Sequence, residues 1–74
     1  MPHVLIKHYP SHISREEKEH IANQISNIIS TGFACSNDVV SVSMLDVEQE
    51  HWNNEVYQPD IENRQDILVK EPNY

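Results

Sequence analysis

An amphipathic helix between two short apolar runs constrains the fold of this 74-residue chain more than any other feature. Ser14 and Glu17 have the spacing of a capping box, in which the two side chains satisfy amides at the start of a helix. The apolar stripe that follows recurs at helical intervals, at Ile21, Ala22, Ile25, Ile28 and Ile29. Gly32 is a natural helix end. We therefore predict a helix from about Arg15 to Thr31.

The runs on either side of this helix are typical of β-strands. In residues 3–8, Val4, Leu5 and Ile6 are all apolar, so neither face is clearly solvent-exposed, which indicates a strand that is covered on both sides. Residues 39–47 alternate, so that one face holds Val40, Val42 and Met44 and the other holds Ser41, Ser43 and Leu45. Strand, helix and strand in this order predict an α+β fold of the β-α-β type, with two parallel strands and a crossover helix.

The segment after Glu48 carries a weaker pattern. We expect a short C-terminal helix that begins at Pro59 and Asp60 and ends before Pro72. Its apolar residues would be Ile61, Ile67 and Leu68.

The length of the chain predicts a single domain that spans residues 1–74. A domain of this size buries only about 60% of the surface that its unfolded chain exposes. Its one cysteine, Cys35, allows no internal disulfide. Because a two-stranded sheet with one helix is not stable alone, we expect a homo-oligomer in which two units share a four-stranded sheet, with both helices on one face.

Charge and hydropathy exclude several kinds of partner. The formal net charge is -7, with 12 acidic and 5 basic side chains, whereas nucleic acids and anionic membrane surfaces attract clustered cations. No basic leader precedes the first apolar run, and no run approaches the ~20 residues of a membrane span. The lone cysteine agrees with a reducing compartment, so we expect a cytoplasmic protein. The five histidines lack the spacing of metal ligands, and we predict no metal site and no cofactor.

Pro2 is the candidate catalytic residue. Methionine before a small residue such as proline is normally removed, and Pro2 would then carry a free secondary amine at the start of a buried strand. An α-amino group titrates near ~7.7–8.0. Apolar walls would lower that pKa by disfavouring the charged form, which gives a base suited to proton transfer near neutral pH. The residues alone also allow a proline that merely enters a strand.

The order of these features resembles the 4-oxalocrotonate tautomerase family over nearly the whole chain. The matching parts are the start Met1-Pro2-His3-Val4-Leu5-Ile6-Lys7, the capped isoleucine helix, the second strand and Trp52. The start, the Trp52 segment and the ending Ile67-Leu68-Val69-Lys70-Glu71-Pro72-Asn73-Tyr74 are closer to one bacterial branch, whose members resemble dimers rather than hexamers. The resemblance implies a homodimeric isomerase in which Pro2, as general acid and base, moves a proton within a small enol or α-keto acid.

The resemblance also implies roles for three further residues. The aromatic wall that helps to keep the family's proline uncharged falls on Trp52. The family's two substrate-binding arginines fall near His12 and on Ser41, so neither arginine is present. We therefore expect the substrate to be a phenylpyruvate-like mono-acid, bound by Trp52, Ser41, His12 and backbone amides. We do not expect efficient turnover of a dicarboxylate. What replaces the two arginines stays open.

Two other functions stay open at this point. A hydratase or decarboxylase of small oxo acids would use Pro2 with an acidic or arginine partner that activates water. The nearest carboxylate by sequence is Asp46, which lies on the strand face opposite Ser41. A non-catalytic oligomeric interaction module would keep the fold and lose both arginines.

Overall fold

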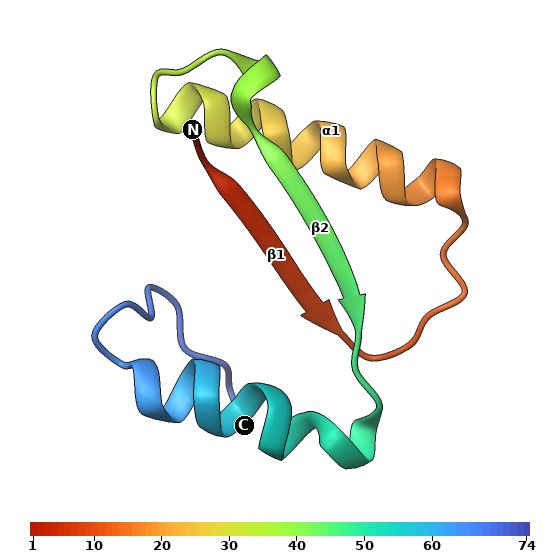
Figure 1. The fold of residues 1–74 in the computed structure, drawn as a ribbon, viewed down its shortest axis with the longest axis vertical. Coiled ribbons are helices and arrows are strands. Elements are labelled where there is room, and N and C mark those ends of the chain that lie inside the picture. The colour runs from red at the N-terminus through yellow and green to blue at the C-terminus, as the bar shows by residue number, and fades with distance from the viewer.

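The computed structural model describes all residues 1–74 and contains a β-α-β unit followed by a C-terminal helical segment (Figure 1). The unit consists of β1 (His3–His8), α1 (Arg15–Gly32) and β2 (Ser41–Asp46). The two strands pair in parallel, with His3 opposite Ser41 and His8 opposite Asp46. The predicted fold class, two parallel strands joined by a crossover helix, is confirmed.

Helix α1 begins where the capping pattern predicts. The Ser14 hydroxyl oxygen accepts a hydrogen bond from the backbone amide of Glu17 at 3.1 Å. The Glu17 carboxylate accepts from the Ser14 hydroxyl at 3.1 Å, and not from the Ser14 amide as a complete capping box requires. The cap therefore satisfies one of the free amides in the first turn, and two glutamates in that turn complement the helix dipole.

The predicted end of α1 is confirmed to within one residue. The helix reaches Gly32, but the residue in the left-handed region is Ala34, with a φ of 54°. The Cys35 amide donates to the Ser30 carbonyl at 3.0 Å, and the Ala34 amide donates to the Thr31 carbonyl at 3.4 Å. These two bonds form a Schellman motif in which alanine stands where glycine is usual.

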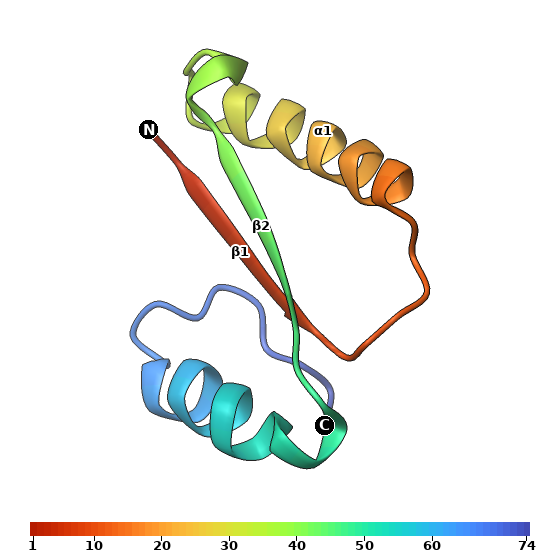
Figure 2. The same ribbon diagram turned by 45° about the vertical axis from the view of Figure 1, so that its right-hand side comes forward.

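Helix α1 and the C-terminal helical segment lie on opposite sides of the strand pair (Figures 1 and 2). The predicted alternation in β2 is confirmed, since Val42 and Met44 are half-buried and Ser41, Ser43 and Leu45 are exposed. The face of the sheet away from α1 is only partly covered, because Leu5 remains 51% exposed and Leu45 49% exposed. The expectation that the first strand is covered on both faces is therefore only partly met within one chain.

The C-terminal helical segment exists, but the predicted position was wrong. It comprises η2 (Gln49–His51), the π-helix η3 (Asn53–Ile61) and η4 (Glu62–Arg64). It begins at Gln49, ten residues before Pro59, and both Ile67 and Leu68 lie beyond its end. Its apolar residues Trp52, Val56 and Ile61 recur at intervals of four and five residues, which is wider than the α-helical spacing used for the prediction.

The chain buries very little on its own. Val47 and Val56 are its only buried apolar residues, and Ser26 is its only buried polar one. Ile28, predicted on the buried stripe of α1, is 72% exposed because it lies at the edge of the stripe and no element of the chain covers it. The accessible surface is 5947 Å², compared with about 4,700 Å² expected for a folded monomer of this mass. No helix in the structure combines the length and the apolar content that crossing a membrane requires.

We predict that Ala34→Gly stabilises the fold, because glycine relieves the contact between Cβ and backbone at a positive φ. The expected gain is about 0.5–1 kcal/mol in the free energy of unfolding, measured by urea titration. Gly32→Ala is the matched control, since an added Cβ meets no atom within 4 Å and the position is helical. It should stabilise the chain by a similar amount. A loss of stability in Ala34→Gly would show that this backbone is not left-handed in solution.

Candidate active site

Pro2 directly precedes β1 and lies in an apolar hollow. Its carbonyl oxygen accepts a hydrogen bond from the Ser41 amide at 3.2 Å, which ties it to the start of β2. The hollow has a volume of about 460 Å³ and is lined by Met1, Pro2, His3, Val4, Ile29 and Phe33. No carboxylate is among these residues. An amine at Pro2 would therefore face apolar walls and no negative charge, a setting that favours its uncharged form.

Ser41 lies at the same end of the sheet as Pro2. It is the partner of His3 in the strand register, and the His3 Nδ1 and Ser41 Oγ atoms form a hydrogen bond of 2.7 Å. Both residues are exposed. The structure thus brings together two of the predicted site residues, Pro2 and Ser41, and adds His3, which the sequence did not indicate.

Trp52 lies at the other end of the sheet, where the C-terminal helical segment begins. Its ring meets Tyr9 edge to face at a centroid distance of 5.0 Å, and its Nε1 donates to the Tyr74 hydroxyl at 3.1 Å. Trp52 also lines a hollow of about 510 Å³. The other residues of this hollow are Leu5, Lys7, Val56, Pro59, Asp60, Ile61, Arg64 and Ile67.

His12 is exposed in the loop that follows β1, so it lies beyond the same end of the sheet as Trp52. Because a strand rises about 3.3 Å per residue, the six residues of β1 separate this end from Pro2 by about 20 Å. The separation is visible in Figure 1, where the N-terminus and the C-terminal helical segment lie at opposite ends of the strand pair. One chain therefore does not assemble the four predicted site residues.

Lys7 fixes the C-terminal helical segment to the sheet. Its Nζ forms an ion pair with Asp60 at 2.5 Å and lies 3.5 Å from the Glu55 carbonyl oxygen, to which it donates. Its side chain is 25% exposed. Sequence reasoning missed this contact, although a lysine directly after three apolar strand residues was the available signal.

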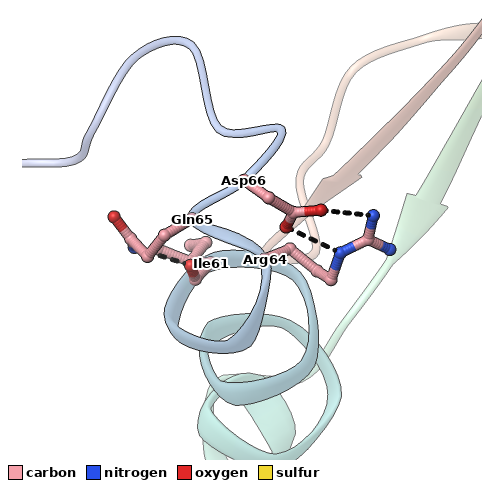
Figure 3. Close-up of polar contacts among 4 residues, drawn as sticks. All are labelled: Ile61, Arg64, Gln65 and Asp66. Carbon is pink, nitrogen blue, oxygen red and sulfur yellow. Dashed lines mark hydrogen bonds and ion pairs between the residues drawn. The ribbon is translucent and has the colours of Figure 1, made fainter.

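Both arginines of the chain are engaged in ion pairs away from Pro2. Arg15 pairs with Glu19 at 3.1 Å on the surface of α1. Arg64 donates from Nε and Nη2 to the two carboxylate oxygens of Asp66, at 3.1 and 3.2 Å (Figure 3). The Arg64 guanidinium holds the pKa of the Asp66 carboxyl below its usual range. Since neither arginine lines the hollow around Pro2, neither can bind an anion there within one chain.

Asp46 is remote from Pro2. It ends β2 and pairs with His8, with 3.4 Å between its Oδ1 and the histidine Nε2. The start of that strand, and not its end, adjoins Pro2. No group of three or more His, Cys, Asp or Glu side chains converges anywhere in the structure.

Comparison with other proteins supports the same family as the sequence features. No model of a known protein family matches the chain. The chain is 39% identical over 74 residues to the protein named Tautomerase PptA of Pectobacterium atrosepticum, and 38% identical to its namesake in Pectobacterium carotovorum. Each match covers 100% of this chain and 97% of the relative. A protein named Probable tautomerase from Xylella fastidiosa is 31% identical over 74 residues, which cover 89% of that protein.

The β-α-β fold and these full-length matches show that the chain belongs to the tautomerase family. Within the family, relatives that are 36–39% identical place it in the PptA branch. The family and the branch predicted from the sequence are thereby confirmed. The names of the relatives support tautomerase activity in general, and so an isomerase.

We predict that Lys7 and Asp60 stabilise the chain jointly. A double-mutant cycle of Lys7→Met and Asp60→Asn should give a coupling of about 0.5–1 kcal/mol, because the pair is partly shielded from solvent. The measurement is urea unfolding followed by Trp52 fluorescence. The control cycle, Arg15→Met with Glu19→Gln, concerns a more exposed helical pair and should couple by no more than about 0.5 kcal/mol. Fully additive effects at Lys7 and Asp60 would contradict the anchoring role.

Proposed function

We propose that this protein is a keto–enol tautomerase of small aromatic α-keto acids such as phenylpyruvate, with Pro2 as its general acid and base. The observation that carries the proposal is the position of Pro2. It stands at the start of β1 in an apolar hollow without a carboxylate, in a chain that matches named tautomerases over its full length. The active form would be a single-domain cytoplasmic protein from which Met1 has been removed, and it would use no cofactor or metal.

The proposed chemistry needs one group that both accepts and returns a proton. An uncharged Pro2 amine accepts the proton of the enol hydroxyl, and the resulting ammonium gives a proton to the neighbouring carbon, so no proton is gained or lost overall. An amine kept uncharged by apolar surroundings can begin this cycle near neutral pH. The pyrrolidine ring restricts the direction of the nitrogen lone pair, so little conformational freedom is lost when it aligns with the substrate.

The second part of the proposal is a two-fold symmetric homodimer. In a dimer whose two strand pairs run antiparallel, the start of one β1 lies near the end of the partner's strands. Trp52 and His12 of one chain would then approach Pro2 and Ser41 of the other, and the partner's Trp52 would shield the amine. The accessible surface of the chain is about 1,200 Å² larger than expected for a folded monomer of this mass. This excess supports association, because a standard interface buries about 800 Å² per partner.

Within one chain, the hollow around Pro2 offers no support for water activation. A hydratase or decarboxylase would require an acidic or arginine partner beside the proline. The nearest candidate, Asp46, pairs with His8 at the far end of β2, and both arginines are paired elsewhere.

We predict that Pro2→Ala lowers the rate of phenylpyruvate enol conversion by roughly ten- to ten-thousand-fold, the range for a positioned acid–base group. The measurement is the loss of enol absorbance. Pro10→Ala, in the exposed loop after β1, is the matched control and should retain the parent rate. Mass spectrometry of the intact parent should show that Met1 is absent. A retained Met1 would block the amine and favour a non-catalytic module, and an unchanged rate in Pro2→Ala would exclude Pro2 as the base.

We predict that two inactive variants restore activity when they are mixed. In a heterodimer of Pro2→Ala and Trp52→Ala chains, one site combines the native Pro2 of one chain with the native Trp52 of the other. An equimolar mixture after subunit exchange should therefore recover about one quarter of the parent activity, since about half of the dimers are mixed and each has one intact site. Activity that stays at the average of the two variants would show that Trp52 does not act across the interface.

A further inference from the structure

His3 and Ser41 form a fixed polar pair next to Pro2. They face each other in the parallel register, and 2.7 Å separates His3 Nδ1 from Ser41 Oγ. The Ser41 amide also donates to the Pro2 carbonyl at 3.2 Å. The backbone pairing of the two strands therefore sets the position of this pair relative to the candidate base.

Burial does not account for the bond between the two side chains. Both residues are exposed, so water could satisfy each group if the bond were absent. His3 Nε2 has no hydrogen-bond partner in the structure, and the Ser41 hydroxyl has only His3. The pair thus keeps hydrogen-bonding capacity that the protein itself does not use.

The chemistry of the pair leaves a donor free in every protonation state. If Nδ1 carries the proton and donates to Ser41, the serine O–H remains available. If Ser41 donates to Nδ1, the proton of the neutral ring lies on Nε2, which then remains available. A protonated ring leaves both donors available and adds a positive charge. An oxygen anion beside the pair therefore always meets at least one N–H or O–H group.

His3 is also the only residue with a polar side chain that lines the hollow around Pro2. The rest of the lining is apolar, and the two arginines are paired with Glu19 and Asp66 elsewhere. Hydrogen bonds from an ordered donor to a carboxylate are stronger than those between neutral groups. We propose that His3 and Ser41 together bind the carboxylate of the α-keto acid or enol, in place of an arginine. The inference rests on the proposed function, because it concerns the same site.

Binding of 3-phenylpropanoate, an unreactive aromatic acid, tests this pair without any turnover. We expect His3→Leu and Ser41→Ala each to weaken binding about ten-fold in an NMR titration, as for loss of a hydrogen bond to a charged group. The double variant should lose little more than either single variant, because the two groups act as one unit. His3→Asn, which keeps a polar atom near the position of Nδ1, should recover most of the affinity. His20→Leu, on the exposed surface of α1, is the matched control and should bind as the parent does.

The methyl ester of 3-phenylpropanoic acid separates recognition of charge from a general change in the hollow. The variants at His3 and Ser41 should bind the ester as the parent does, and they should raise KM for phenylpyruvate enol more than they lower kcat. Equal losses for the acid and the ester, unchanged binding in His3→Leu, or no binding of the acid by the parent would each overturn the inference. Full turnover by Pro2→Ala would contradict the proposed function and not the inference about His3 and Ser41. The binding titration would still decide whether these two residues bind the carboxylate.

Discussion

The parallel pairing of β1 with β2 is the constraint on which the rest of the structure depends. Parallel strands need a crossover connection, which α1 supplies, and their amino ends necessarily meet at the same end of the sheet. That geometry places Ser41 next to Pro2 although 38 residues separate His3 from its partner in the register. It also sends the residues that follow each strand, including His12 and Trp52, to the opposite end. The division of the candidate site into two halves is therefore a direct consequence of the topology.

The same topology leaves the chain short of a core. In a unit of two strands and one helix, the only interior lies between the helix and one face of the sheet. Here α1 covers that face, but none of its apolar side chains is buried. The helical segment on the other face adds Val56 to the buried set, and Lys7 holds it there by an ion pair. Because burial of apolar surface is the main favourable term in folding, so small an interior is consistent with the proposed association of two chains. In the proposed dimer, the association of two chains would also complete the candidate active site.

Sequence reasoning succeeded where a single periodicity governs a segment. Helix α1 and β2 follow the periods 3.6 and 2, and their boundaries and faces were predicted to within one or two residues. It failed in the C-terminal helical segment, where the wide turns of a π-helix space Trp52, Val56 and Ile61 by four and five residues, more on average than the period of 3.6. Nothing local in the sequence marks Ala34 for the left-handed conformation that follows the helix end at Gly32.

The residues of the candidate site come from separate strands and loops of the chain. Pro2 and Ser41 were found because the family pattern marks their positions, and the structure adds His3 because the register places it opposite Ser41. No spacing in the sequence could have revealed that pair, since its members belong to different strands. Whether Trp52 and His12 act with them depends on a second chain, which no intramolecular pattern encodes.

Within one chain no arginine lies beside Pro2, and this alters the electrostatic demands on the site. A nearby guanidinium would help to keep the amine uncharged by like-charge repulsion, and a second carboxylate on the substrate would have the opposite effect. Without the cation, the proposed uncharged amine would depend on apolar surroundings, which within the chain are Val4, Ile29 and Phe33. Such surroundings tolerate one carboxylate bound by neutral donors better than two, and they also accommodate an aromatic ring. If Pro2 acts as proposed, the lack of the family's two arginines and a preference for an aromatic mono-acid would be two consequences of the same change in how the amine is kept uncharged.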